Sequence, residues 1–136
     1  METGLREVLR KTRRAVIKVG TSVLIEKTGG AGGTTGRLSH RALINLAREI
    51  ALFQKRGFET VLVSSGAIAS GMQHLGFRKR PSKLSELQAC AAVGQPILMQ
   101  LYQAALAKAR LHVAQVLLTR SDLEDKGRFL NARHTL

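Results

Sequence analysis

Hydrophobic positions along the chain form two patterns, short runs that are mostly apolar and longer stripes with helical spacing. The short runs at residues 15–19, 60–63 and 113–118 are rich in β-branched residues and leucine, and each is followed by glycine or polar residues. Apolar runs of this length without regular polar alternation are typical of strands buried on both faces of a parallel sheet. We therefore predict three strands.

Helical spacing separates these runs. In residues 41–56 apolar side chains recur every three or four positions, with Ser39 placed to cap the helix start and Gly57 placed to end it. Pro96 is expected to kink or divide the helix at residues 84–109, because proline lacks an N–H and clashes with the preceding turn. Further helices are predicted at residues 67–74, from the capping-box spacing of 121–124, and at 129–136.

Strands that alternate with helices predict the α/β class. The expected architecture is a three-layer αβα sandwich with a mainly parallel sheet. In such sheets ligands bind at the carboxyl ends of the strands, which here are followed by the polar loops 20–22, 64–66 and 119–122. Residues 1–14 are expected to form a short basic amphipathic helix or arm, and residues 29–36 form a glycine-rich tract. The pattern reaches Leu136 inside an apparent helix, so we expect the sheet to be incomplete at its C-terminal end.

Composition limits the classes of protein. The chain has 136 residues, which suits one domain, and its 44% hydrophobic content argues against a disordered tail. Aromatic residues make up only 4%, so the core should be aliphatic. No apolar run approaches the roughly 20 residues that span a bilayer. Cys90 is the single cysteine and is expected in the core; without an internal disulfide, a reducing cytoplasm is the expected compartment.

Charge leaves an alternative open. The chain has 22 Lys and Arg against 9 Asp and Glu, a net charge of +13. Basic patches at residues 10–14 and 78–83 would suit nonspecific binding to phosphate backbones, so a nucleic-acid-binding module without enzymatic activity is a second hypothesis. Against it, aromatic side chains for base stacking are scarce, and neither helix-turn-helix nor zinc-site spacing is present.

The loop after the first strand has the chemistry of a phosphate site. Lys18 supplies a positive charge at the strand end, and Gly20 lets phosphate oxygens approach the backbone amides of Thr21 and Ser22. The Walker A spacing is absent from the chain. On spacing alone, Lys18 is better explained as a surface lysine.

Three other polar groups have both a functional and a structural explanation. The Ser64–Ser65–Gly66–Ala67 loop opens a helix whose amides would face an anion, or else it only caps that helix. Asn131 and His134 could reach a polar ligand, although an exposed helix face explains them better. Acidic residues near residue 122 could bind Mg²⁺, but helix capping is the better explanation, so we assign no metal ligand; these are Asp122, Glu124 and Asp125.

Four ordered blocks resemble the glutamate 5-kinase family. Residues 16–24 and 61–71 look like its first two signatures. Two more segments are similar to the family: residues 91–95 with 98–99, and residues 115–120 followed by 128–133. The blocks cover nearly the whole chain. The resemblance implies the amino-acid-kinase fold and ATP-dependent phosphorylation of the side-chain carboxylate of L-glutamate to L-glutamyl 5-phosphate, the first step of proline biosynthesis, with Mg²⁺ accompanying ATP.

The resemblance also implies roles for individual residues. Lys18 would be the catalytic residue that contacts the transferred phosphate, and Gly20, Thr21 and Ser22 would line the phosphate loop. The glutamate site would be formed by Ser65, Gly66, Ala67, Asn131 and His134. The family often has an acidic residue where His134 stands, which would pair with the α-ammonium of the substrate; a neutral imidazole adds no charge there.

The family pattern continues beyond Leu136. Residues 1–136 would be the N-terminal, amino-acid-substrate part of the kinase domain, with the nucleotide-binding half and any C-terminal domain outside them. We expect a cytoplasmic homo-oligomer that binds glutamate and ATP. An unpaired sheet edge in this chain predicts marginal stability or self-association. A folded fragment that binds glutamate weakly without catalysis is a third hypothesis.

Overall fold

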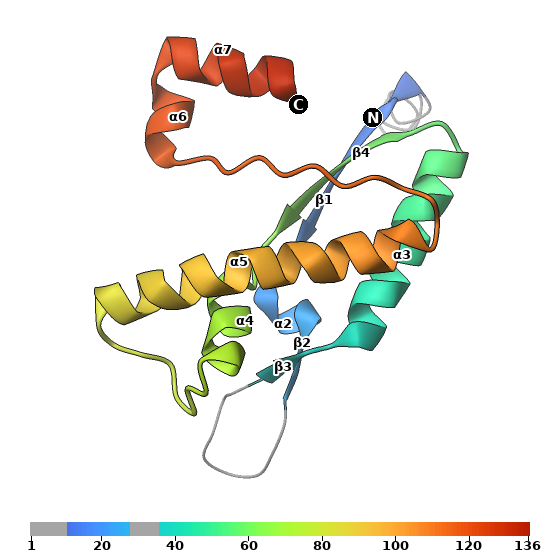
Figure 1. Ribbon diagram of the computed structural model, residues 1–136. Coiled ribbons are helices and arrows are strands. Elements are labelled where there is room, and N and C mark those ends of the chain that lie inside the picture. The colour runs from blue at the N-terminus through green and yellow to red at the C-terminus, as the bar shows by residue number, and fades with distance from the viewer. Residues whose placement is uncertain (1–10, 28–35) are drawn as a thin grey trace, which may run out of the picture.

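The computed structural model of the protein describes residues 11–27 and 36–136 (Figure 1). The predictions for residues 1–14 and 29–36 therefore fall mainly outside the described residues. Within the described residues the elements are, in order, β1 (Arg14–Val19), α2 (Thr21–Leu24), β2 (Ile25–Lys27), β3 (Gly36–Leu38), α3 (His40–Lys55), β4 (Glu59–Ser64), α4 (Ala67–His74), α5 (Leu84–Ala107), α6 (Arg120–Glu124) and α7 (Lys126–Thr135).

Strands β1 and β4 form a parallel pair, as two of the three apolar runs predicted. Ile17 lies opposite Leu62 in the register, and Val19 lies opposite Ser64. Helix α3 lies between these strands in the sequence, as a crossover between parallel strands requires. Strands β2 and β3 form a separate antiparallel pair that the sequence analysis missed, because three residues are too short for a periodic signal.

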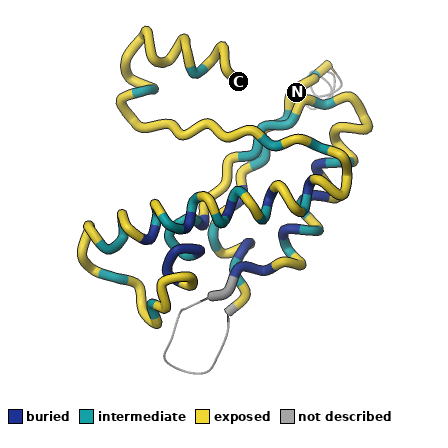
Figure 2. Tube along the Cα trace, viewed as in Figure 1, coloured by how far each residue is buried: buried dark blue, intermediate teal, exposed yellow. Residues whose placement is uncertain are grey.

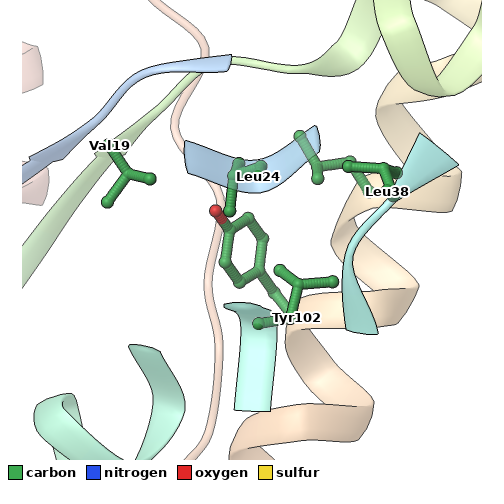
Figure 3. Close-up of a cluster of buried hydrophobic side chains, with 6 residues drawn as sticks. Val19, Leu24, Leu38 and Tyr102 are labelled. Carbon is green, nitrogen blue, oxygen red and sulfur yellow. The ribbon is translucent and has the colours of Figure 1, made fainter. Parts of the chain in front are cut away.

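The core lies between one face of this sheet and helices α3 and α5. Val19 packs with Leu43 from α3 and with Leu98 and Tyr102 from α5, and Ile17 and Leu62 pack against the same cluster. The buried residues follow the facing sides of these elements (Figure 2). A close view shows Tyr102 next to Leu24, with Val19 and Leu38 farther away on either side (Figure 3). The core is mainly aliphatic, as predicted, and Cys90 is fully buried in its thiol form.

Cap residues in the sequence predict the ends of helix α3 correctly. Ser39 caps α3, with its hydroxyl accepting a hydrogen bond from the Ala42 amide at 3.2 Å, and Gly57 follows the helix with a φ of +81°. These two predictions are confirmed. Helix α4 has the predicted bounds.

The third predicted strand, at residues 113–118, is wrong. Residues 111–119 have no regular secondary structure, and they pair with no strand among the described residues. Residues of this segment and of β4 both line a cavity of about 740 Å³. An apolar run gives only strand propensity, whereas a strand also needs a backbone partner at hydrogen-bonding distance. The α/β class is confirmed, with two parallel strands rather than three.

Two helix predictions need correction. Helix α5 continues through Pro96, so the expected division there is wrong. Proline removes one N–H, which would bond the Ala92 carbonyl, and packing along the rest of the 24-residue helix offsets one lost bond. The capping box before α6 is formed by Thr119 and Asp122, not by Ser121 and Glu124, although both pairs have the same spacing.

Candidate functional site

The parallel register brings the loops after β1 and β4 side by side. The Thr21 hydroxyl donates to Ser65 Oγ at 3.0 Å. The Ser65 hydroxyl donates to the Val19 carbonyl at 3.3 Å, and the Ser65 amide donates to the same carbonyl at 3.2 Å. Both predicted loops therefore form one polar surface at the carboxyl end of the sheet, where α/β proteins bind ligands.

Gly20 leaves the backbone of the first loop accessible. Its φ of −79° suits any residue, and a Cβ there would have only Ser22 Oγ nearby, at 3.9 Å. The first backbone hydrogen bond of α2 runs from the Val23 amide to the Gly20 carbonyl at 3.1 Å. The amides of Thr21 and Ser22 come before this bond in the chain, so they are not donors within α2. Neither strain nor packing in the described residues requires a glycine here. What glycine provides is room for a ligand close to these amides.

Lys18 lies on the exposed side of β1, next to this loop. In the register it lies opposite Val63, on the sheet face opposite that of Val19. Among the described residues it has no ion pair or side-chain hydrogen bond, so its ammonium is available to an anion.

Gly66 begins α4 with a conformation that favours glycine. Its φ is +125°, and the helix has no side-chain cap. The loop does supply the N-cap, Gly66, but no serine side chain caps the helix, because the Ser64 and Ser65 hydroxyls bond to other partners. The first turn of α4 keeps its amides directed at the loop, where the helix dipole favours negative charge.

A glycine contact fixes α4 against α5. A Cβ on Gly71 would lie 1.8 Å from the Cys90 carbonyl oxygen, and one on Gly94 would lie 1.9 Å from the Ala67 carbonyl oxygen. The two helix backbones therefore touch, and this contact sets the position of Ala67 in the candidate site. Sequence reasoning missed this helix contact; the signal was the spacing of four between small residues, Ala67 with Gly71 and Cys90 with Gly94.

Tyr102 connects α5 to the second loop, and sequence reasoning missed it too. Its hydroxyl lies 2.6 Å from Ser64 Oγ. Burial raises the pKa of the Tyr102 phenol from its ordinary value of 10.0, and the hydrogen bond to Ser64 offsets part of this rise. The phenol is therefore protonated at neutral pH. Its only sequence signal is that it is the single tyrosine of the chain.

Asn131 and His134 lie elsewhere in this structure. Both are exposed on α7, which packs on α6 and lies apart from α2 and α4 (Figure 1). The structure therefore brings together the candidates from the first two loops but not those from α7.

The acidic residues near α6 have structural partners. Asp122 accepts from the Thr119 amide at 2.7 Å, Asp125 caps α7 by accepting from the Arg128 amide at 2.8 Å, and Glu124 pairs with Arg120. The prediction that these carboxylates serve capping is confirmed for Asp122 and Asp125. Within residues 11–27 and 36–136, no three side chains able to hold a metal ion come together. No described helix is long and apolar enough to cross a membrane.

The family comparison and the individual relatives point to the same group of proteins. Residues 13–136 match the sequence profile of the amino acid kinase family. The chain is 49% identical to the glutamate 5-kinase of Nitrosospira multiformis and 48% identical to that of Paraburkholderia phytofirmans, in each case over 97% of this chain and 34% of the relative. The glutamate 5-kinase of Carboxydothermus hydrogenoformans is 45% identical over 96% of this chain. The chain spans about a third of the length of these curated relatives.

Proposed function

Because this chain belongs to the amino acid kinase family, we propose that it is the amino-acid-substrate part of a glutamate 5-kinase. The reaction transfers the γ-phosphate of ATP to the side-chain carboxylate of L-glutamate and gives L-glutamyl 5-phosphate, the first step of proline biosynthesis. The nucleotide-binding half of the domain, and any C-terminal domain, would lie outside residues 1–136. The similarity to glutamate 5-kinases over a third of their length supports this division.

The observation that carries the proposal is the hydrogen bond between Thr21 and Ser65, which joins the two loops. An acceptor carboxylate and a donor phosphate must lie within reach of each other for transfer, and one polar surface made from both loops meets that requirement. The open space at Gly20 fits a phosphate group close to the amides of Thr21 and Ser22.

Each loop has a separate task in this proposal. Lys18 neutralises the charge that develops on the transferred phosphoryl group. Ser65, Gly66 and Ala67 hold the glutamate through the loop and the first turn of α4, whose dipole favours a carboxylate. Asn131 and His134 would complete the glutamate site, which requires α7 to lie closer to α4 than it does here.

ATP supplies the phosphoryl group when it is bound, together with Mg²⁺. Lys18, Gly20, Thr21 and Ser22 suit its terminal phosphates in charge and in open space. No described side chains are assigned to the metal, because no suitable group of ligands comes together in the described ranges. Acceleration then comes from orientation and charge neutralisation by these loops.

We also propose that the enzyme is a cytoplasmic homo-oligomer. The free, buried Cys90 fits a reducing compartment. The exposed apolar side chains Val16 and Val63, on one sheet face, suit contact with another chain or copy. The similarity to glutamate 5-kinases favours the kinase over a nucleic-acid-binding module.

The test is titration of the ¹⁵N-labelled chain with L-glutamate, followed by NMR. We expect saturable shifts of the Gly66 and Ala67 amides, weakened in Ser65→Ala and smaller with L-glutamine, which lacks the side-chain charge. A folded chain whose loop amides do not respond would contradict the assignment of the glutamate site.

A second assay addresses the phosphate loop. Glutamate-dependent release of ADP should disappear in Lys18→Ala. If the chain alone has no activity, the same substitution is to be made in a chain that carries the nucleotide-binding half. Full activity of Lys18→Ala there would contradict the role of Lys18.

A further inference from the structure

We propose that Tyr102 is a positioning residue that sets the direction of the Gly66 amide in the substrate loop, acting through Ser64 and the Ser65 carbonyl. The inference rests on the proposed function for its substrate, L-glutamate. Its structural part, the orientation of one peptide group, is independent of that function.

The direction of the hydrogen bonds follows from proton counting. The Ser64 hydroxyl has one proton and donates it to the Ser65 carbonyl at 3.1 Å. With that proton used, we assign Ser64 Oγ as the acceptor from Tyr102, whose hydroxyl lies 2.6 Å away. The chain of donors thus runs from α5 through β4 into the loop.

The carbonyl at the end of this chain is otherwise free to turn. Within the described residues, no backbone N–H donates to the Ser65 carbonyl. The Ser64 hydroxyl is thus the group that holds it. Gly66, which follows, has a φ of +125° and no Cβ to limit its backbone.

Peptide geometry transmits this restraint to the substrate loop. A peptide group is planar, and all described peptide bonds are trans. The N–H of Gly66 therefore points opposite to the carbonyl of Ser65. Fixing that carbonyl fixes the direction of an amide that we assign to L-glutamate.

Tyr102 is well suited to act as the fixed end. The residue is 4% exposed and belongs to the buried cluster that includes Val19, Leu24 and Leu98. Its ring lies next to Leu24 (Figure 3). Packing on these sides restricts the ring, so the hydroxyl keeps its place while Ser64, which is exposed, would otherwise bond water. A helix that does not itself form the loop thereby orders a donor within it.

The experiment compares three variants of the ¹⁵N-labelled chain. Tyr102→Phe removes the phenolic oxygen but keeps the ring, and Ser64→Ala removes the middle of the chain of donors. Thr60→Val is the matched control: Thr60 is on the same strand, and its buried hydroxyl oxygen has no partner among the described residues. We measure the amide shift of Gly66 and the dissociation constant for L-glutamate.

Tyr102→Phe and Ser64→Ala should each shift the Gly66 amide and weaken L-glutamate binding by roughly three- to ten-fold. The double variant should bind as weakly as either single one, because both break the same chain. Thr60→Val should leave the Gly66 amide and the binding unchanged.

Other results would overturn the proposal. One is a Gly66 amide shift that does not change in Tyr102→Phe. Another is L-glutamate binding by Tyr102→Phe that equals that of the unmodified chain. The third is a double variant in which the effects of Tyr102→Phe and Ser64→Ala add. Failure of the unmodified chain to bind L-glutamate would contradict the proposed function instead, while the Gly66 amide would still decide the role of Tyr102.

Discussion

Single hydroxyl groups form several of the hydrogen bonds that connect separate elements of this fold. Thr21, Ser64, Ser65 and Tyr102 use theirs to connect loops and helices. Ser70, in contrast, is 2% exposed and its hydroxyl oxygen has no partner among the described residues. The value of a buried hydroxyl depends on whether it is bonded, since an unbonded one keeps the full cost of desolvation.

Ser70→Ala should therefore stabilise the chain. Removing a buried, unbonded hydroxyl and adding alanine to α4 should raise the free energy of unfolding by about 1 kcal/mol. Urea denaturation measures it. Ser85→Ala, at an exposed position of α5, is the control for helix propensity and should change stability less. A destabilised Ser70→Ala would mean that the hydroxyl has a partner, such as water.

Tyr102 predicts a loss of stability at alkaline pH. Burial raises its pKa in the folded chain above the ordinary value of 10.0. Its contribution is therefore fully present below the unfolded pKa and is lost as pH rises through the folded pKa. Urea denaturation from about pH 9 to about pH 11 should show this decline, and Tyr102→Phe should have a shallower one. Equal slopes would contradict the raised pKa.

At the scale of elements, helix ends and backbone contacts decide the arrangement. The ends follow from local chemistry, as at Ser39 and Gly57, so the sequence predicts them. The contact of α4 with α5 joins residues that are distant in the sequence, and it depends on two helices meeting without a side chain between them. The spacing of four between small residues marks each helix separately, but it does not tell which two helices will meet.

Gly94→Ala should disrupt this contact. The new Cβ would lie 1.9 Å from the Ala67 carbonyl oxygen and 2.3 Å from the Gly71 amide nitrogen, and both are backbone atoms that cannot turn aside. We expect a loss of about 3 kcal/mol or more, with α4 displaced. Thermal unfolding measures this loss of stability. Gly20→Ala is the control, because its φ of −79° and its surroundings accept a Cβ. Similar melting of both variants would contradict the backbone contact.

Asp122 predicts that the start of α6 weakens in acid. The Thr119 hydroxyl, then the Thr119 amide and the Arg128 side chain, lower the pKa of Asp122 from its ordinary value of 3.8. Its contribution is present above the unfolded pKa and is lost as pH falls through the lower folded pKa. An NMR titration of the Asp122 carboxyl should give a midpoint below 3.8, which Thr119→Ala should raise. A Thr119→Ala midpoint equal to that of the unmodified chain would contradict the capping box.

At the scale of the whole molecule, the sheet is covered on one side and open on the other. Alternation along β1 and β4 predicts which residues share a face, but not which face will be covered. Residues 113–118 show the same limit: their composition favours a strand, while pairing depends on a partner far away in the sequence. For the site, a parallel sheet was enough to predict that the two loops meet. The link through Tyr102 could not be predicted, because it depends on the position of α5.

The open face predicts association at high protein concentration. Val16 is 66% exposed and Val63 is 48% exposed, and they lie on the sheet face opposite that of Val19. Burying them favours association, whereas the net charge of +13 opposes it. Sedimentation velocity should show larger species as protein concentration rises, and more of them with added salt, which screens the repulsion. Val63→Lys should reduce them, and a monomer under all these conditions would contradict the prediction.

The glycines of the contact between α4 and α5 and the glycine of the first loop should respond differently to selection. In a library of random substitutions that is screened only for folding, positions 71 and 94 should keep glycine, because the helix contact excludes any side chain. Position 20 should accept many residues in that screen, because its conformation and surroundings tolerate them. A screen for ligand binding should then restore glycine at position 20. The difference between the two screens would separate what the fold requires from what its ligand requires.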